Sequence, residues 1–231
     1  MNKSFEASLK YLQTKKKILF LTTSNRREGA HEMPKSTQLA HYMAGLIGND
    51  KVTVHDISRM NIYPCEGNVS WREGNSCGLA ASKLNDQEKN PTGFHRCRAS
   101  INHPDDELRK VSKSLFESDC VVFFTSVRWW QTNMMYQKLI ERLTWIENRH
   151  STFGEENIIK DIDAGIIAIG HNWKNEEVIN NQKEVMEQFG FKVPKQLSRW
   201  WIFTDMNDES NASYQKAGEQ FEKDFWFELQ K

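Results

Sequence analysis

Aromatic and polar side chains that could hold a ligand follow a buried-strand pattern in VVFFTSVRWWQTN, residues 121–133. The run Val121–Phe124 is continuously apolar, which is typical of a strand covered on both faces. After Thr125 the next five residues are Ser126, Val127, Arg128, Trp129 and Trp130. Two tryptophans in a loop suit a planar aromatic ligand whose edge is bound by main-chain groups, although such residues also occur in cores and at partner surfaces. The segment therefore predicts a site for a flat ring.

A second candidate site lies in TTSNRREGAHEMPKST, residues 22–37, which leads into a helix pattern. Ser24, Ser36 and Thr37 supply hydroxyls, and Arg26 supplies a cation. Hydroxyls and backbone N–H groups at a helix N-terminus, with a cation nearby, form an anion site that is typical for phosphate. The alternative is that Ser36 only caps the helix and the cations are solvated. We predict a phosphate site in which Ser36 serves both purposes.

Two common nucleotide motifs are incomplete in this segment. No G-x-G-x-x-G dinucleotide fingerprint is present. The stretch GAHEMPKS, residues 29–36, fits G-x-x-x-x-G-K-[ST] except that Pro34 replaces the second glycine, and proline supplies neither the N–H nor the permissive dihedrals. The strand pattern at 119–125 also lacks a terminal aspartate for Mg²⁺. The sequence therefore disfavours a nucleoside triphosphatase.

A third loop, GHNWKN at residues 170–175, contributes Gly170 and His171. A single histidine is more often structural than functional, so its position beside the other two loops adds only modest support. A phosphate site in one loop and a flat-ring site between two others together predict a mononucleotide with an extended linker, FMN.

Alternating strand and helix patterns are expected to bring these loops together. Strands are predicted at 16–24, 51–57, 119–125, 163–170 and 198–205, and helices at 36–48, 104–118, 134–149, 175–190 and 210–229. Five alternations predict an α/β fold with a doubly wound, mostly parallel sheet. Ligands bind such sheets beyond the carboxyl ends of the strands, where all three loops lie.

Composition favours a single domain, residues 1–231, with a small-molecule partner. Lys plus Arg and Asp plus Glu each number 31, so no net charge favours nucleic acid or anionic lipid. No stretch approaches the roughly 18 apolar residues of a membrane helix, and MNKSFEASLKYLQ lacks the apolar region of a signal peptide. The four cysteines show no disulfide spacing. We expect a cytoplasmic protein with no nucleic-acid or membrane partner.

The phosphate and ring segments together resemble the flavodoxin-like NAD(P)H-dependent FMN reductases, especially the branch near the iron–sulfur flavoproteins. The phosphate motif of that family resembles S-x-R-x-x-G-N-[ST]-x-x-L. Here Ser24, Arg26 and Gly29 match it, and Ser36-Thr37-Gln38-Leu39 follows after an insertion.

The ring motif of the family resembles T-P-x-Y-W followed by K-x-x-x-D-R. Thr125 and Trp129 match it, whereas Ser126 replaces the proline and Arg128 replaces the tyrosine. Further along, Gln137 stands for the lysine and Glu141-Arg142 for the acid–arginine pair. The altered residues predict a changed edge toward the flavin ring.

The resemblance implies a five-stranded flavodoxin-like sheet of order 2-1-3-4-5 and FMN as cofactor. It also implies NAD(P)H as co-substrate, a quinone, nitro compound, flavin or similar small molecule as electron acceptor, and assembly into a homodimer or homotetramer. FMN carries the redox chemistry, so no catalytic side chain is assigned. The alternative is a flavodoxin-like electron-transfer or FMN-binding protein without its own NAD(P)H activity.

The cluster cysteines of the iron–sulfur branch are not retained. That branch has a stretch resembling P-C-x-x-C-x-x-C, whereas here Pro64-Cys65 is followed by Asn68 and Trp71. No iron–sulfur cluster is expected, since such clusters need four close ligands. A zinc site from Cys65, Cys77, Cys97 and His95 or His103 is a weaker alternative, because the usual short ligand spacing is missing.

A long insertion, residues 58–103, separates the second strand from the next helix. Loops of this length in a compact domain are usually functional or cover another part of the protein. We expect a lid or dimer arm near the flavin, and a mobile surface excursion is the alternative.

Overall fold

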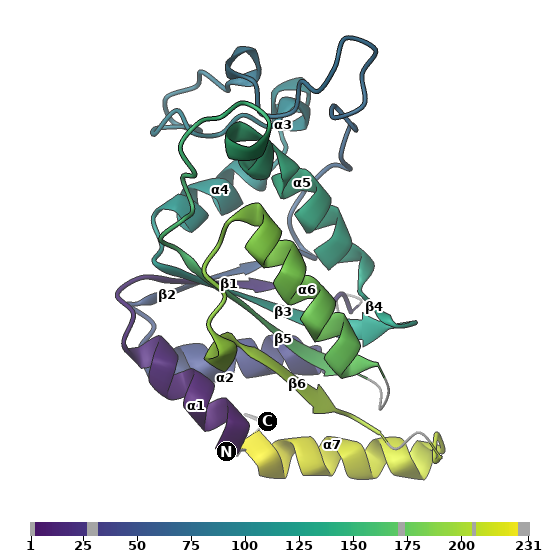
Figure 1. The fold of residues 1–231 in the computed structure, drawn as a ribbon. Helices are drawn as coiled ribbons and strands as arrows, with labels where there is room; N and C mark the ends of the chain where they lie inside the picture. The colour runs from purple at the N-terminus through teal and green to yellow at the C-terminus, as the bar shows by residue number, and fades with distance from the viewer. Residues whose placement is uncertain (1–2, 27–31, 171–173, 205–206, 226–231) are drawn as a thin grey trace.

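A parallel sheet between two layers of helices forms the body of the protein in the computed structural model, which describes residues 3–26, 32–170, 174–204 and 207–225 (Figure 1). The strands are β1 Ile18–Thr22, β2 Val52–Asp56, β3 Cys120–Arg128, β4 Gln131–Thr132, β5 Asp163–Gly170 and β6 Ser198–Ile202. The α-helices are α1 Lys3–Gln13, α2 Lys35–Ile47, α3 Arg98–Asn102, α4 Leu108–Phe116, α5 Met134–Ser151, α6 Asn175–Phe189 and α7 Asn211–Phe225. Two 3₁₀ helices are η1 Ala80–Ser82 and η2 Lys195–Leu197.

The strand order is β2-β1-β3-β5-β6, with all of these neighbours parallel. The expected order 2-1-3-4-5 counted only five strands. The sheet contains a sixth, because β3 continues to Arg128, reverses, and pairs antiparallel with the two residues of β4. A two-residue strand carries no periodic pattern, so the sequence did not reveal it.

The central strands are buried because helices cover both faces of the sheet. All residues of β1 and β5 are buried. Leu19 and Leu21 face the layer of α4, α5 and α6, whereas Ile18 and Phe20 face the layer of α1, α2 and α7. This alternation explains why strands with continuous apolar runs lie inside a doubly wound fold.

Helix α1 is an element that the sequence reading did not assign. Its buried residues Phe5, Ser8 and Leu12 recur at helical spacing, and the ring of Phe5 packs edge-on against Phe225 of α7, with 4.9 Å between centroids. A serine in the middle of the buried face weakens the apolar pattern, so the helix depends on tertiary contacts with the rest of its layer.

Residues 58–103 form an irregular lobe over α4 and α5, at the top of Figure 1. The lobe packs closely on α5: a Cβ at Gly78 would lie 2.5 Å from the carbonyl oxygen of Trp145, and Gly78 has a φ of +88°. Glycine is therefore required where the lobe backbone touches the helix.

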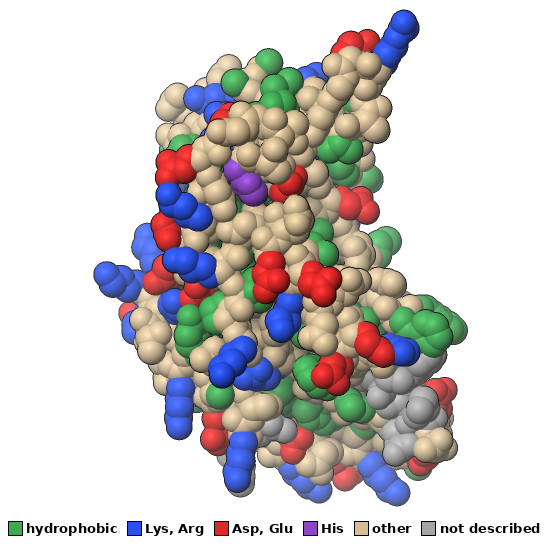
Figure 2. Space-filling view, viewed as in Figure 1, with side chains coloured by type: hydrophobic (Ala, Val, Ile, Leu, Met, Phe, Trp, Pro, Cys, Tyr) green, Lys and Arg blue, Asp and Glu red, His purple; other side chains and the backbone are tan. Residues whose placement is uncertain are grey.

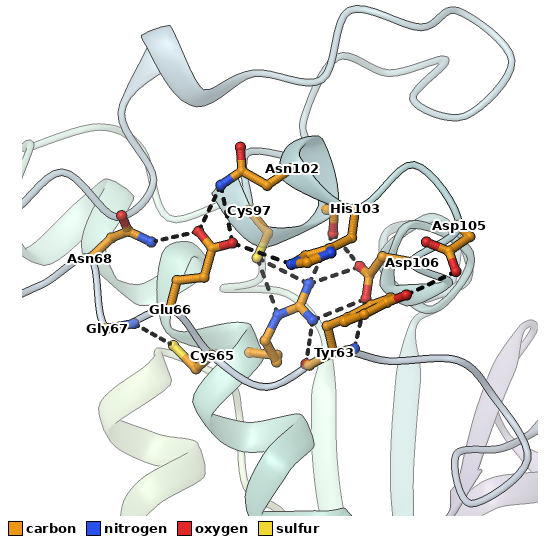
Figure 3. A network of polar contacts seen from close by, with 12 residues as sticks. Tyr63, Cys65, Glu66, Gly67, Asn68, Cys97, Asn102, His103, Asp105 and Asp106 are labelled. Carbon is orange, nitrogen blue, oxygen red and sulfur yellow. Dashed lines mark hydrogen bonds and ion pairs between the residues drawn. The ribbon is translucent and has the colours of Figure 1, made fainter.

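A buried ion pair joins Asp106, just beyond the lobe, to Arg142 of α5 (Figure 3). Arg142 and Asp106 both have fully buried side chains, and Arg142 donates to the two carboxylate oxygens at 3.0 and 2.8 Å. Arg142 also donates to the Tyr63 carbonyl at 2.6 Å and to the Ser100 hydroxyl at 3.0 Å. Burial alone would raise the pKa of Asp106, but the hydrogen bonds from Arg142 and Ser100 lower it. Arg142, the arginine of the acid–arginine motif, thus makes a structural connection.

The same ion pair corrects the expected helix at 104–118. Helix α4 begins only at Leu108. Asp106 is not a solvated residue of the first helical turn, because its carboxylate turns inward to meet Arg142.

In the described part of the chain, no helix has both the length and the apolar character needed to span a membrane.

Candidate functional site

A cavity of about 400 Å³ opens at the carboxyl edge of the sheet. Its walls come from the loop after β1, the start of α2, the ends of β3 and β5, the residue after β6 and the first turns of α7. The lining residues are Ser24, Asn25, Arg26, Pro34, Lys35, Ser36, Ser126, Val127, Arg128, Ile169, Gly170, Phe203 and Tyr214. The cavity lies where a doubly wound sheet binds ligands.

Seven of the residues predicted from sequence line this cavity. They are Ser24, Arg26, Ser36, Ser126, Val127, Arg128 and Gly170. Thr37 is 2% exposed and does not line it, and neither do Trp129 and Trp130. His171 lies outside the described residues. For all eleven residues, contact with a ligand stays a prediction.

The first turn of α2 provides a set of anion-binding donors. Its N-cap position is held by Pro34, and no side chain caps the helix, so the N–H groups of the first turn lack helical partners. The Thr37 hydroxyl is buried and has no hydrogen-bond partner among the described residues. The expectation that Ser36 caps the helix is wrong: Ser36 lies inside α2, and its hydroxyl donates to Ser24 at 2.8 Å. The N–H groups of Lys35 and Ser36, which belong to this turn at the cavity wall, fit a phosphate group.

Two cations beside this turn are held by one carboxylate. Arg26 donates to the main-chain carbonyl of Glu32 at 2.8 Å and lies 3.4 Å from a carboxylate oxygen of the same residue. Lys35 forms an ion pair with the other carboxylate oxygen. Burial alone would raise the pKa of Glu32, but the hydrogen bond and charge of Lys35, with smaller effects of Gln38 and Arg26, lower it. The Glu32 carboxylate therefore offsets one of these two positive charges within the protein.

Asn133 organises the hydroxyls behind the cavity. Its side-chain amide lies within donor distance of the Thr125, Thr23 and Ser126 hydroxyls at 2.9, 3.1 and 3.2 Å, and of Ser24 at 3.5 Å. Its carbonyl oxygen accepts from the N–H of Tyr136 and so caps α5. The sequence reading missed this role, although an asparagine directly before a helix pattern is a recognisable N-cap signal.

The ends of β3 and β5 pack closely against each other beside the cavity. A Cβ at Gly170 would lie 2.7 Å from the Cβ of Val127 and 2.6 Å from the side-chain oxygen of Asn175. Glycine therefore allows the ends of β3 and β5 to approach each other, and it leaves main-chain groups at the cavity.

An apolar wall was not anticipated from the sequence. Ile169, Phe203 and Tyr214 line the cavity, and the rings of Phe203 and Tyr214 lie 6.2 Å apart between centroids. Only the loops after the first, third and fourth expected strands were predicted to carry the site. The loop after the fifth expected strand opens at the same edge, and this position could have indicated that Phe203 lines the cavity.

The two tryptophans form the turn between β3 and β4. Trp129 and Trp130 have φ values of +48° and +62°, and Arg128 pairs with Gln131 across the turn. Such a two-residue turn favours Asn-Gly, so bulky residues are strained there. Trp129 is 91% exposed and Met134 is 70% exposed. Figure 2 shows hydrophobic side chains gathered at this edge of the molecule.

None of residues 58–103 lines the cavity. Arg59 of this segment contacts a residue of the cavity wall, since its guanidinium donates to the Arg26 carbonyl at 2.7 Å. Within the described ranges, no group of three or more His, Cys, Asp and Glu side chains is arranged to hold a metal ion. The role of the lobe as a lid or dimer arm stays a prediction.

The fold resembles that of several solved proteins, although the sequence matches no known family model and no curated protein. RosB, solved with a bound 8-demethyl-8-formylriboflavin-5'-phosphate intermediate, aligns with a TM-score of 0.56 and 13% identity over 91% of this chain and 76% of RosB. An azoreductase from Bacillus anthracis aligns with a TM-score of 0.52 and 15% identity over 91% of this chain and 97% of the azoreductase. The azoreductase AzrA aligns with a TM-score of 0.51 and 13% identity over 90% of this chain and 97% of AzrA. These alignments establish the flavodoxin-like fold.

Proposed function

We propose that this protein is an FMN-dependent oxidoreductase that takes electrons from NAD(P)H and passes them to a small-molecule acceptor such as a quinone, a nitro compound or a flavin. The cavity at the carboxyl edge carries the proposal, because it combines phosphate-type donors with main-chain groups and an apolar wall. The fold shared with RosB, which was solved with a riboflavin-5'-phosphate derivative, and with two azoreductases adds support.

The phosphate of FMN would bind at the first turn of α2. Its free N–H groups and the hydroxyls of Ser24 and Ser36 supply donors, and Arg26 and Lys35 supply positive charge. Asn133 orients the serine hydroxyls from behind. These contacts fix the position of the cofactor along the sheet edge.

The ring would lie beside the main chain of Ser126–Arg128 and Gly170, with Phe203 and Tyr214 forming an apolar wall. When bound, FMN supplies the capacity to accept a hydride and to release electrons. The chain's own residues position the ring and exclude water from one side. No described side chain is assigned a catalytic proton transfer. A homodimer or homotetramer is part of the proposal, as the family resemblance implies.

Titration of the apo-protein with FMN tests cofactor binding. A saturable change in the flavin absorbance band, with riboflavin binding more weakly, is the expected result. Protein that stays colourless and leaves the FMN spectrum unchanged would refute the proposal.

Anaerobic mixing of the FMN form with NADH and with NADPH tests the reductase activity. Bleaching of the flavin by either nucleotide supports an enzyme. If only dithionite bleaches it, the protein is an electron carrier or an FMN-binding module.

A further inference from the structure

Glu32 holds two of the three cations that line the cavity, Arg26 and Lys35, without lining the cavity itself; the third cation is Arg128. One carboxylate oxygen pairs with Lys35, and the other lies 3.4 Å from Arg26. Gln38 approaches the same carboxylate at 3.4 Å. Arg26 and Glu32 are 41% and 40% exposed in their side chains, so this contact can exchange with a ligand.

The charges of Arg26, Lys35 and Glu32 sum to a net charge of about +1 at neutral pH, because one carboxylate offsets one of the two cations. A bound phosphomonoester brings about −1.5 to −2. The phosphate and the Glu32 carboxylate therefore compete for hydrogen bonds from Arg26 and Lys35, and their negative charges repel each other. The N–H groups of the first turn of α2 stay available, because they have no partner in the helix.

We propose that Glu32 competes with a ligand's phosphate for Arg26 and Lys35, and thereby sets the preference of the cavity for phosphorylated over unphosphorylated ligands. This inference rests on the proposed function for the identity of FMN as ligand. It assigns Glu32 the role of a specificity-determining residue that limits binding of anions such as free phosphate or unrelated phosphate esters.

The opposite role would be preorganisation, in which Glu32 holds the cations ready for phosphate. Competition is the stronger effect here for two reasons. Lys35 is already confined, since its side chain is 10% exposed and its ammonium lies 5.5 Å from the ring centre of Phe221. Arg26 also donates to the main-chain carbonyl of Glu32, and a substitution of the Glu32 side chain does not remove this hydrogen bond.

The variant Glu32→Gln tests the inference, since it removes the charge but keeps an oxygen that can accept from Lys35. We expect the affinity for FMN to rise about tenfold while the affinity for riboflavin, which has no phosphate, is unchanged. The gain should shrink in an Arg26→Ala background, because one of the contested donors is absent. Glu107→Gln is the matched control: Glu107 pairs with Lys110 at the same three-residue spacing, outside the cavity.

Three results would overturn the inference. These are a fall in FMN affinity, an equal shift for FMN and riboflavin, and an equal gain in Glu107→Gln. If neither the parent nor Glu32→Gln binds any flavin, the proposed function fails, and inorganic phosphate then serves as the probe. The inference stands in that case only if phosphate raises the melting temperature of Glu32→Gln more than that of the parent, and it falls otherwise.

Discussion

Two cation–carboxylate clusters in this molecule differ in burial and in the number of their partners. The side chains of Arg142 and Asp106 are inaccessible to solvent. The guanidinium also donates hydrogen bonds to the Cys97 sulfur, the Tyr63 carbonyl and the Ser100 hydroxyl. Arg26, Lys35 and Glu32 lie at the mouth of a cavity, where the arginine and the carboxylate are two-fifths exposed. The first cluster cannot exchange partners without unfolding the lobe, whereas the second can. Burial therefore separates a structural ion pair from a candidate binding group.

The largest effect is expected from Arg142→Met. The substitution leaves the Asp106 carboxylate buried without its partner, which typically costs about 3–5 kcal/mol of unfolding free energy. Urea denaturation of the apo-protein measures this loss, and FMN affinity in the folded fraction should stay near that of the parent. The double variant Arg142→Met/Asp106→Leu should recover much of the stability. A loss below about 1 kcal/mol would mean that the pair is as weak as an exposed one.

A buried histidine in the lobe gives a second expected difference, in the pH dependence of stability. Burial lowers the pKa of His95 to about 3, and its Nδ1 lies 2.9 Å from the Ser112 hydroxyl. The unfolded chain binds this proton near pH 6.5, and the native state does not. The stabilising contribution is therefore complete above pH 6.5 and is lost as the pH falls toward 3, at about 1.4 kcal/mol per pH unit.

Urea midpoints between pH 4.5 and 7 measure this slope. His95→Gln should flatten it, whatever its effect at pH 7. His55→Gln is the comparison, because His55 is only half-buried and bonded to Ser114 at 2.8 Å. An unchanged slope in His95→Gln would show that another group titrates in this window.

The exposed cluster of Arg26, Lys35 and Glu32 should differ from the buried Arg142–Asp106 pair, because a substitution in it should affect FMN affinity more than stability. Arg26→Ala should change stability by less than about 1 kcal/mol, because exposed ion pairs contribute little. It should weaken FMN binding by about 1.5–3 kcal/mol if the guanidinium meets the phosphate. Equilibrium titration and urea denaturation on the same variant separate the two quantities. Lys160→Ala, which breaks an exposed pair with Glu156, is the control. Equal FMN affinity in both variants would remove Arg26 from the site.

The sequence predicted the layered fold and the edge of the sheet that carries the cavity, because both follow from local patterns. The apolar runs of β3 and β5 and the polar residues after them are legible without any long-range information. What it missed depends on partners distant in the chain. Asp106 resembles an ordinary acid at a helix start until Arg142 is placed beside it.

The same limit applies within the candidate site. In the sequence, Glu32 gives no sign that it pairs with two cations. Tyr214 occupies an ordinary helix position, and only the fold brings it beside Phe203. Ser24, Arg26 and Ser126 were predicted because phosphate and ring sites use these residue types at strand ends.

The smallest expected effect concerns the turn between β3 and β4, where the sequence departs from the preferred residues. Trp129→Asn with Trp130→Gly places the favoured pair at two positions of positive φ, and we expect a gain of about 1 kcal/mol in apo-protein stability. Trp129 is too exposed for its loss to leave a cavity in the core. If Trp129 also packs on the flavin, the variant should lose about 0.5–1.5 kcal/mol of FMN affinity and regain flavin fluorescence. A stable variant with unchanged affinity and spectrum would place the strained turn outside the cofactor site. A loss of several kcal/mol in stability would contradict the exposed position of Trp129.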